Sequence, residues 1–308
     1  MPIRDRLPQR VTIVEVAPRD GLQAEERIVP ADAKVAFIER LAGAGHRVIE
    51  ATSFVSSKAV PQLADAEEIA ARLPRREGLR CVAFVPNERG LERALAAGFT
   101  SVAFFTSATE TYSVKNVGRT RAEVLEQLGG LVATAKGAGA RVRAYLAMAI
   151  ADPWEGPVPL DTSVEAARRL LDLGIDELAI GDTLGSGTPR QVQDLIGAIL
   201  DAGARPERLA VHFHDTYGQA LANVLAVLEL GVTTIDASTG GIGGSPFAKE
   251  AAGNLATEDL VWMLDGLGVE SGVDAVKVAE AAVWMCGLLG REPPGRATRA
   301  LARLSDEL

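Results

Sequence analysis

Leu173-Gly174-Ile175-Asp176-Glu177-Leu178 is one of six similar stretches in which a small residue or leucine precedes glycine and a short apolar run follows. The other five stretches begin at Ala44, Ala97, Ala138, Ala202 and Leu230. Glycine is favoured just after a helix C-terminus, because the chain there enters the left-handed region of backbone conformation. The stretches follow segments with helical spacing, such as 164–172. The repeat therefore predicts alternating helices and strands.

Two further apolar runs, at 11–16 and 80–85, bring the number of expected strands to eight. The strands are expected near 11–16, 47–51, 80–85, 101–105, 141–147, 177–181, 208–213 and 232–236. Eight alternating strands and helices over about 250 residues predict an α/β fold of the (β/α)8 TIM-barrel type. A doubly wound open sheet is the alternative. It would normally carry a glycine-rich fingerprint after its first strand, and Pro18-Arg19-Asp20-Gly21-Leu22 is not one.

We expect one domain over residues 1–308, because no linker or low-complexity segment divides the chain. The barrel core is expected over about 11–268, with an extra C-terminal helix and tail over 273–308. The Pro- and Arg-rich end at 291–308 is expected to fray. The apolar stretch 278–289 either covers the barrel or forms a dimer face. A homodimer or a higher homo-oligomer is expected.

The composition is that of a soluble globular protein, with 47% hydrophobic and 24% charged residues. A net charge of −9 and a pI near 5.1 argue against binding to nucleic acid or to a membrane surface. Cys81 and Cys286 lie far apart, so neither a disulfide framework nor a zinc motif is expected. Residues 1–10 lack the apolar core of a signal peptide, and no stretch has the length of a transmembrane helix. These features predict a cytoplasmic protein.

Two of the three histidines, His212 and His214, lie one residue apart at the end of the apolar run Leu209-Ala210-Val211. Side chains of a strand alternate between its faces, so both imidazoles point the same way. Two imidazoles on one face at a strand end are a ready pair of metal ligands. The alternative is a pair of histidines that only make hydrogen bonds in a polar patch. The scarcity of histidine in this chain favours the metal site.

Polar residues stand where the predicted strands end. Arg19 and Asp20 follow the first strand, Glu50 ends the second, Asp182 ends the sixth, and Asn254 comes after the eighth. Because the active site of a TIM barrel lies at the C-terminal ends of its strands, these residues are expected to converge on one rim. Each has a structural alternative. Asp182 could cap the next helix, Glu50 could be an ion-pair partner of Arg19, and Asn254 could cap the final helix.

The expected ligands Asp20, His212, His214 and Asn254 combine oxygen and nitrogen donors without thiolate. This set favours Mg²⁺ or Mn²⁺ over structural zinc. Such an ion is a Lewis acid that lowers the pKa of a substrate hydroxyl. Arg19 beside it is a fixed cation suited to an enolate oxygen. Together these groups suit cleavage of a carbon–carbon bond in a β-hydroxy acyl compound.

Five blocks of the sequence carry a resemblance to a known family. They are EVAPRDGLQ (15–23), VIEATSFV (48–55), GDTLGSGT (181–188), VHFHDTYGQALAN (211–223) and GGIGGSPFAKEAAGNLATEDLVWML (240–264). Together and in this order they resemble the 3-hydroxy-3-methylglutaryl-CoA (HMG-CoA) lyase family of metal-dependent TIM-barrel lyases. The resemblance extends from about Val11 to Leu289.

The resemblance implies cleavage of HMG-CoA, or of a related 3-hydroxyacyl-CoA, to acetyl-CoA and a keto acid, which is acetoacetate for HMG-CoA. The implied residues are Asp20, His212, His214 and Asn254 as ligands of a divalent cation, Arg19 as the group that stabilises the enolate, and Glu50 and Asp182 as supporting catalytic carboxylates. The substrate is an acyl-CoA thioester, and Lys115 and Asn116 are expected to bind it.

The sequence departs from the family pattern at two positions. The family has a cysteine in its glycine-rich loop, and that thiol is thought to transfer a proton, whereas this chain has Ser245 followed by Pro246. A serine hydroxyl is a far weaker acid, although it could position a water that donates the proton. Ser245 is nevertheless kept as a catalytic candidate, in a segment, 240–245, that indicates a lid or a flexible turn. The second, smaller departure is the stretch Ala151-Asp152-Pro153-Trp154-Glu155-Gly156 after the fifth strand, where the family tends to have a Gly-Cys-Pro pattern.

Two other functions are alternatives. A Claisen-type condensing enzyme of the same superfamily would use the same site, but such synthases generally carry a long C-terminal accessory region, and this sequence stops soon after the barrel. A catalytically impaired homologue would bind acyl-CoA or metal without turnover. The presence of all four expected ligands together with Arg19 argues against it.

Overall fold

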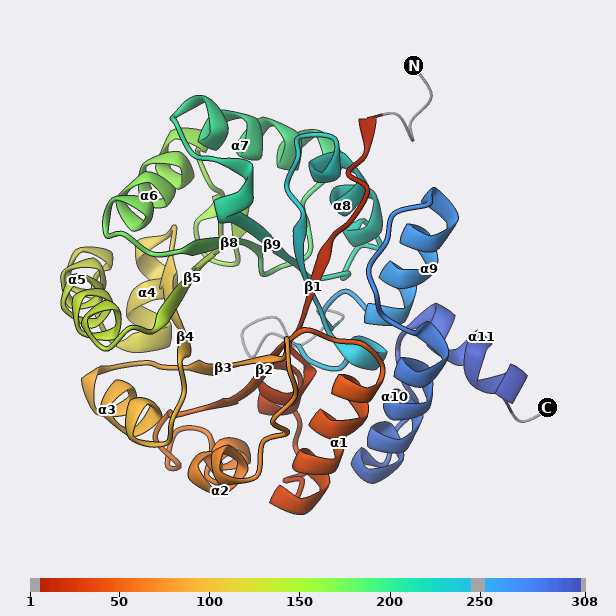
Figure 1. Cartoon of the computed structure of the whole chain (residues 1–308). Helices are drawn as coiled ribbons and strands as arrows, with labels where there is room; N and C mark the ends of the chain where they lie inside the picture. Colours follow the sequence, from red (N-terminus) through yellow and green to blue (C-terminus); the bar gives the residue numbers. More distant parts are fainter. Residues whose placement is uncertain (1–5, 245–252, 306–308) are drawn as a thin grey trace.

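The computed structural model describes residues 6–244 and 253–305, and eight parallel strands within them close into a barrel (Figure 1). The strands are β1 (Thr12–Glu15), β2 (Val48–Ser53), β3 (Arg80–Phe84), β4 (Ser101–Ser107), β5 (Arg141–Ala147), β8 (Glu177–Asp182), β9 (Leu209–Phe213) and β10 (Thr234–Ala237). Around the barrel they follow the order β1-β10-β9-β8-β5-β4-β3-β2. Each predicted strand is therefore confirmed to within a few residues, and the predicted TIM barrel is confirmed.

Helices surround the barrel, and each strand is followed by at least one of them (Figure 1). These helices are α1 (Ala31–Gly43), α2 (Ala66–Ala71), α3 (Glu88–Ala96), α4 (Glu110–Val117), α5 (Arg121–Gly137), α6 (Leu160–Asp172), α7 (Pro189–Asp201), α8 (Ala220–Leu228) and α9 (Thr257–Leu267). The six glycines of the repeated stretch all have positive φ, between 76° and 105°. At Gly45 a side chain is also excluded by space, because a Cβ would lie 2.2 Å from the carbonyl oxygen of Gly272.

Apolar side chains fill the barrel as well as the layer between strands and helices. The inner cluster takes at least one side chain from each of seven strand segments and includes Val14, Val48, Val82, Ala103, Tyr145, Ala179 and Ala210. A larger cluster packs the outer faces of the strands against the helices. The barrel is therefore a packed core, and chemistry is confined to the ends of its strands.

Two irregular segments shape the rim at the C-terminal ends of the strands. A π-helical turn, η2 (Ala17–Gly21), follows β1 directly, and the backbone N–H groups of Arg19, Asp20 and Gly21 all donate to the Val16 carbonyl. A short hairpin, β6 (Ala151–Asp152) with β7 (Gly156–Pro157), follows β5. Wide turns of the π type occur frequently at functional sites.

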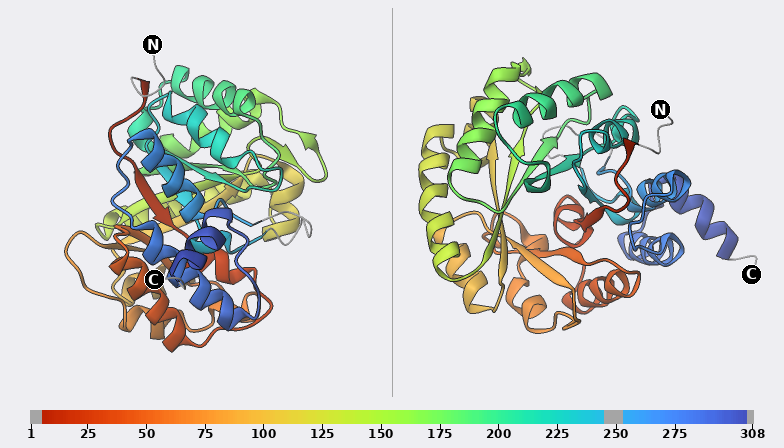
Figure 2. Two further views of the ribbon diagram at one scale, coloured as in Figure 1. Left: turned by 90° about the vertical axis from the view of Figure 1, so that its right-hand side faces the viewer. Right: turned by 45° about the horizontal axis from the view of Figure 1, so that its top comes forward.

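The C-terminal region contains two helices beyond the barrel, α10 (Ala275–Leu289) and α11 (Arg296–Ser305). Helix α10 lies beside α1 (Figure 1). Between them, Trp284 contacts the Phe37 ring and the Arg40 guanidinium. Helix α11 lies on the outer side of α10 (Figure 2). The predicted extra helix is confirmed.

The expectation that 291–308 frays is wrong for the part that the structure describes. Helix α11 forms there because the Asp259 carboxylate accepts hydrogen bonds from the backbone of Arg296 and Ala297, and because Leu301 is buried. Among the described residues, no helix has the length and apolarity needed to span a lipid bilayer.

Candidate active site

Asp20, His212 and His214 bring their side chains together at the barrel rim. One ligand atom of each lies within 4.8 Å of the corresponding atoms of the other two. His212 is in β9 and His214 follows it after one residue, which confirms that both imidazoles serve one face, as strand alternation predicts. Asp20 reaches the same point from the π-helical turn after β1. Residues almost 200 positions apart therefore converge on one small space.

Asn254 lies at the edge of this triad. Its Nδ2 donates to Asp20 Oδ2 at 2.8 Å and to the Ile242 carbonyl at 3.3 Å. Its Oδ1 is buried and has no hydrogen-bond partner among the described residues. Asn254 does not cap the final barrel helix, because α9 begins at Thr257 with Ala256 as its N-cap. A buried amide oxygen without a partner needs an explanation, and this one is suited to bind a cation beside Asp20.

The four side chains fit a hard divalent cation. His212 Nε2 lies 3.9 Å from Asp20 Oδ2, which is too long for a hydrogen bond. Two ligands of one Mg²⁺ ion, each about 2.1 Å from it, lie about 3 to 4 Å apart. Two imidazole nitrogens, a carboxylate and the unpartnered Oδ1 of Asn254 form a mixed donor set of the kind that Mg²⁺ or Mn²⁺ accepts.

Arg19 is held against this triad and is only 5% exposed. Its Nη1 donates to Asp20 Oδ1 at 2.8 Å, its Nε donates to Glu50 Oε1, and its guanidinium carbon lies 4.5 Å from the centre of the Phe84 ring. Burial disfavours the charge, but the neighbouring carboxylates outweigh burial and raise the pKa of Arg19 above its ordinary value. Burial likewise disfavours ionisation of Asp20, yet the charge of Arg19 and of the two histidines lowers the pKa of Asp20 to about 2.

Glu50 is the partner that orients Arg19. One carboxylate oxygen accepts from Arg19 and the other accepts from the Tyr145 hydroxyl. The strand pairing shifts register just after Glu50, so this side chain stands at a bulge. The structural alternative for Glu50, an ion pair with Arg19, is therefore present in the structure. It is compatible with a catalytic role, because it fixes the guanidinium beside Asp20 of the triad.

Asp182 ends β8 and its carboxylate turns toward the following loop. The oxygens accept the backbone N–H groups of Ser186 at 3.2 Å and Gly187 at 2.8 Å. It thus shapes the turn before α7, whose N-cap is Thr188, and does not cap that helix. Burial raises the pKa of Asp182 to about 6, despite these hydrogen bonds. Its catalytic role stays a prediction.

The chain is similar to known proteins along almost its whole length. The model of the HMGL-like family matches residues 10–284. The chain belongs to the HMGL-like family. It is 44% identical to the mitochondrial hydroxymethylglutaryl-CoA lyase of Rattus norvegicus, over 97% of this chain and 91% of the relative. It is 46% identical to the cytoplasmic 3-hydroxy-3-methylglutaryl-CoA lyase of Danio rerio, over 96% of this chain and 88% of the relative.

Solved structures agree with this membership. The hydroxymethylglutaryl-CoA lyase of Pseudomonas aeruginosa matches with a TM-score of 0.94 and 40% identity, over 97% of this chain and 99% of that one. An HMG-CoA lyase from Acinetobacter baumannii, in complex with coenzyme A and 3-methylmalate, matches with a TM-score of 0.90 and 34% identity, over 95% of both chains. The predicted resemblance to the HMG-CoA lyase family is confirmed.

Two predicted residues of this HMGL-like chain, Lys115 and Asn116, are not part of the triad. Lys115 and Asn116 are exposed near the end of α4, and the Lys115 ammonium lies 5.0 Å from the centre of the Trp154 ring. Their role in binding acyl-CoA stays a prediction. Ser245 lies outside the described residues, so its role stays a prediction as well.

Asp152, at the second departure from the family pattern, is a buried structural carboxylate. It accepts the Thr109 hydroxyl at 2.5 Å and the backbone N–H groups of Trp154 and Glu155. Thr109 stands immediately before α4, so this carboxylate ties the hairpin after β5 to the start of that helix. Asp152 therefore has a structural role at the rim: it connects the hairpin to the start of α4.

Sequence reasoning missed three side chains around the site. Tyr145 holds Glu50, and Asp236 and Arg143 stand behind His212. A signal was present, because Arg143 and Asp236 are ionisable residues inside the predicted strands 141–147 and 232–236. Ionisable residues inside a barrel strand are costly to bury unless they are paired.

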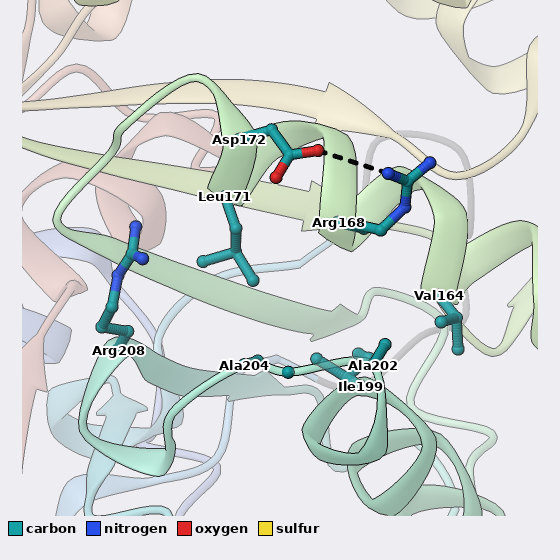
Figure 3. Close-up of a pocket in the computed structure, with 9 residues that line it drawn as sticks. Val164, Arg168, Leu171, Asp172, Ile199, Ala202, Ala204 and Arg208 are labelled. Carbon is teal, nitrogen blue, oxygen red and sulfur yellow. Dashed lines mark hydrogen bonds and ion pairs between the residues drawn. The ribbon is translucent and has the colours of Figure 1, made fainter.

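A surface pocket between α6 and α7 is separate from this site (Figure 3). Its lining includes Arg168, which pairs with Asp172, and Arg208, which donates to the Ile175 carbonyl. None of the predicted site residues lines it. The rim at the C-terminal ends of the strands remains the candidate active site.

Proposed function

We propose that this chain is a divalent-metal-dependent carbon–carbon lyase that cleaves HMG-CoA to acetyl-CoA and acetoacetate. The observation that carries the proposal is the placement of Arg19, which is buried against Asp20 of the ligand triad and fixed by Glu50. A cation held at this position suits an enolate, and the relatives at 44% and 46% identity are HMG-CoA lyases.

The cation would be held by Asp20, His212, His214 and Asn254, and we propose Mg²⁺ or Mn²⁺. Bound there, it supplies Lewis acidity that lowers the pKa of the substrate 3-hydroxyl. With the ion bound, Asp20 and the two imidazoles would hold it beside Arg19, so a substrate hydroxyl that binds the ion would lie close to the guanidinium.

Arg19 is the residue that we propose to stabilise the developing negative charge. When the 3-hydroxyl passes its proton to one of the supporting carboxylates that we propose, Glu50 or Asp182, the bond between C2 and C3 breaks and C3 becomes the ketone of acetoacetate. The electron pair of the broken bond passes to the thioester as an enolate, whose negative charge lies on the oxygen. Among the described residues, Arg19 Nη2 has no hydrogen-bond partner, while Nε and Nη1 are engaged by carboxylates. This amino group is therefore available to the enolate oxygen.

Proton transfer completes the reaction, because the enolate must gain a proton at C2 to give acetyl-CoA. We propose Glu50 and Asp182 as the supporting catalytic carboxylates and Ser245 as the residue that positions a proton-donating water. A serine hydroxyl does not readily donate its own proton near pH 7, since it is a far weaker acid than the thiol of the family.

The substrate is proposed to be an acyl-CoA thioester whose coenzyme contacts Lys115 and Asn116. The exposed ammonium of Lys115 suits phosphate groups, and a relative of similar fold has been solved with coenzyme A. We also propose a cytoplasmic location, as for the Danio rerio relative, although other relatives are mitochondrial. A homodimer or higher homo-oligomer completes the proposal.

The experiment that tests the proposal is an assay of the purified protein with HMG-CoA and Mg²⁺ or Mn²⁺. We expect equal amounts of acetyl-CoA and acetoacetate. A panel of other 3-hydroxyacyl-CoA thioesters tests the acyl preference. Preferential condensation of acyl-CoA substrates would instead support the Claisen-type enzyme, and tight acyl-CoA binding without any product would support the impaired homologue.

A further inference from the structure

A second layer of charged side chains lies behind His212, inside the barrel. His212 Nδ1 lies 3.1 Å from Asp236 Oδ2, and the other oxygen of Asp236 accepts a hydrogen bond from Arg143. Arg143 also pairs with Glu177 Oε1 at 3.3 Å. Asp236 and Arg143 are 2% and 3% exposed. These residues come from β9, β10, β5 and β8, so the chain of contacts crosses the barrel.

We infer that Asp236 and Arg143 are positioning residues of the metal centre, which fix the tautomer and the ring orientation of His212. The inference rests on the metal centre of the proposed function and adds residues to it. The role does not require either side chain to touch the substrate.

The hydrogen-bond chemistry of the imidazole supports this role. A neutral imidazole carries its proton on one nitrogen and a lone pair on the other. A carboxylate is an acceptor, so Asp236 selects the tautomer in which Nδ1 carries the proton. The lone pair is then on Nε2, which is the nitrogen that faces Asp20 across 3.9 Å. Partners of this kind on the distal nitrogen commonly orient metal-binding histidines.

Arg143 fixes the orientation of Asp236, and through it the tautomer of His212. Because an arginine only donates hydrogen bonds, it occupies one carboxylate oxygen of Asp236 and leaves the other for His212. The remaining inner cluster contains mainly valine and alanine. Buried charges in such a cluster are costly, and apolar side chains would fill the space at less cost. Positioning of His212 at the rim explains why Asp236 and Arg143 are buried here in place of apolar residues.

The isosteric variant Asp236→Asn tests the inference with little change in packing. The amide oxygen must face Arg143, so the amide NH2 faces His212 Nδ1 and forces the proton onto Nε2, the nitrogen needed by the metal. The double variant Asp236→Asn, Arg143→Met removes this constraint. The amide can then turn its oxygen to Nδ1 and restore the original tautomer.

The chain has three histidines, so ¹⁵N-labelled imidazoles give three resolvable spin systems by NMR. We expect the Nδ1–H tautomer of His212 in the metal-free wild type at about pH 9, where imidazole is neutral. Asp236→Asn should show the Nε2–H tautomer, and the double variant should show Nδ1–H again. An Asp236→Asn protein that keeps Nδ1–H overturns the inference.

Mn²⁺ affinity, measured by calorimetry on the same proteins, gives the second readout. We expect Asp236→Asn to weaken binding by about 10- to 100-fold and the double variant to recover part of the loss. Asp65→Asn is the matched control, because Asp65 also pairs with a buried cation, Lys34, at 2.8 Å and is not part of the triad. Its Mn²⁺ affinity should equal that of the wild type.

The outcomes separate this inference from the proposed function. If the wild type and Asp236→Asn bind Mn²⁺ equally well, the positioning role of Asp236 is contradicted, but the metal centre is not. Wild-type protein that binds no Mn²⁺ contradicts the metal centre itself and, with it, the positioning role. The inference is also overturned if the double variant binds Mn²⁺ more weakly than Asp236→Asn and does not regain the Nδ1–H tautomer of His212. A role of these residues in packing alone predicts that result.

Discussion

At the scale of single residues, the site depends on how Arg19 is held. Its guanidinium is planar and donates to Asp20 and Glu50 in two directions, while its face lies over the Phe84 ring. A lysine at this position would keep the charge but not the fork geometry. The function proposed for Arg19 therefore depends on shape as well as on charge.

Arg19→Lys should lose most of the turnover. Removing a preorganised donor of this kind costs roughly 3 to 4 kcal/mol in the barrier. Steady-state kinetics with HMG-CoA should show a large fall in kcat. Arg93→Lys is the control, since the Arg93 guanidinium donates two hydrogen bonds to the Glu67 carboxylate on the surface. An unchanged kcat with only a raised KM for Arg19→Lys would argue for a binding role instead.

Ser245→Cys tests the proton route. A thiol with a pKa near 8.5 is a far better acid near neutral pH than an alcohol. If a water positioned by Ser245 donates the proton, the cysteine variant should cleave HMG-CoA no faster than the wild type. A gain of about 10²- to 10⁴-fold would contradict the water route, because general acid catalysis by the residue itself contributes on that order.

At the scale of secondary structure elements, the barrel units follow from local signals. Apolar runs placed the eight strands, and the six repeated glycines have the positive φ expected after a helix. Helix α11 was missed because its start is capped by Asp259, 37 residues earlier in the chain. The π-helical turn at Ala17–Gly21 has no comparable local signature. The formation of α11 and of the π-helical turn therefore depends on contacts between segments that are distant in the sequence.

Asp259→Ala should destabilise α11 specifically. Loss of the carboxylate leaves the backbone N–H groups of Arg296 and Ala297 without their acceptor, at a cost of about 1 kcal/mol. Hydrogen exchange should show faster exchange over 296–305, with little change in the barrel strands. Asp265→Ala on the exposed side of α9 is the control and should leave this exchange unchanged. Equal protection of α11 in both variants would show that the cap is dispensable.

At the scale of the whole molecule, closure of the barrel brings the site together. The sequence predicted that Asp20, His212 and His214 share one rim, because the C-terminal ends of barrel strands do so. It also offered the ion pair between Arg19 and Glu50 as one interpretation of Glu50. It could not predict Asp236 behind His212, since the contact depends on the register between β9 and β10, which pairs Asp236 with His212 and is not visible in either strand alone.

The same closure buries Glu258, whose carboxylate accepts the backbone N–H of Gly240. Burial raises the pKa of Glu258 from 4.5 to about 8. The folded protein therefore holds a proton that the unfolded chain releases, so this contribution to stability is complete below about pH 4.5 and is lost as the pH rises toward 8. Glu258→Gln should remove this decline. The difference in unfolding free energy between wild type and variant, measured in urea from pH 5 to 9, should change by several kcal/mol. A difference independent of pH would contradict the assignment.

Metal removal and return is the measurement that tests the central claim most directly. Acetoacetate production from HMG-CoA is followed for protein stripped with a chelator and then supplied with Mg²⁺ or Mn²⁺. His212→Ala is compared with a variant of His46, a buried histidine that lies 3.4 Å from Glu15 and is not part of the triad. We predict that stripped wild type is inactive and recovers with either ion, that His212→Ala neither retains metal nor recovers, and that His46→Leu retains metal. Full cleavage by the stripped protein, or full metal occupancy and activity in His212→Ala, would contradict a metal-dependent lyase built on Asp20, His212 and His214.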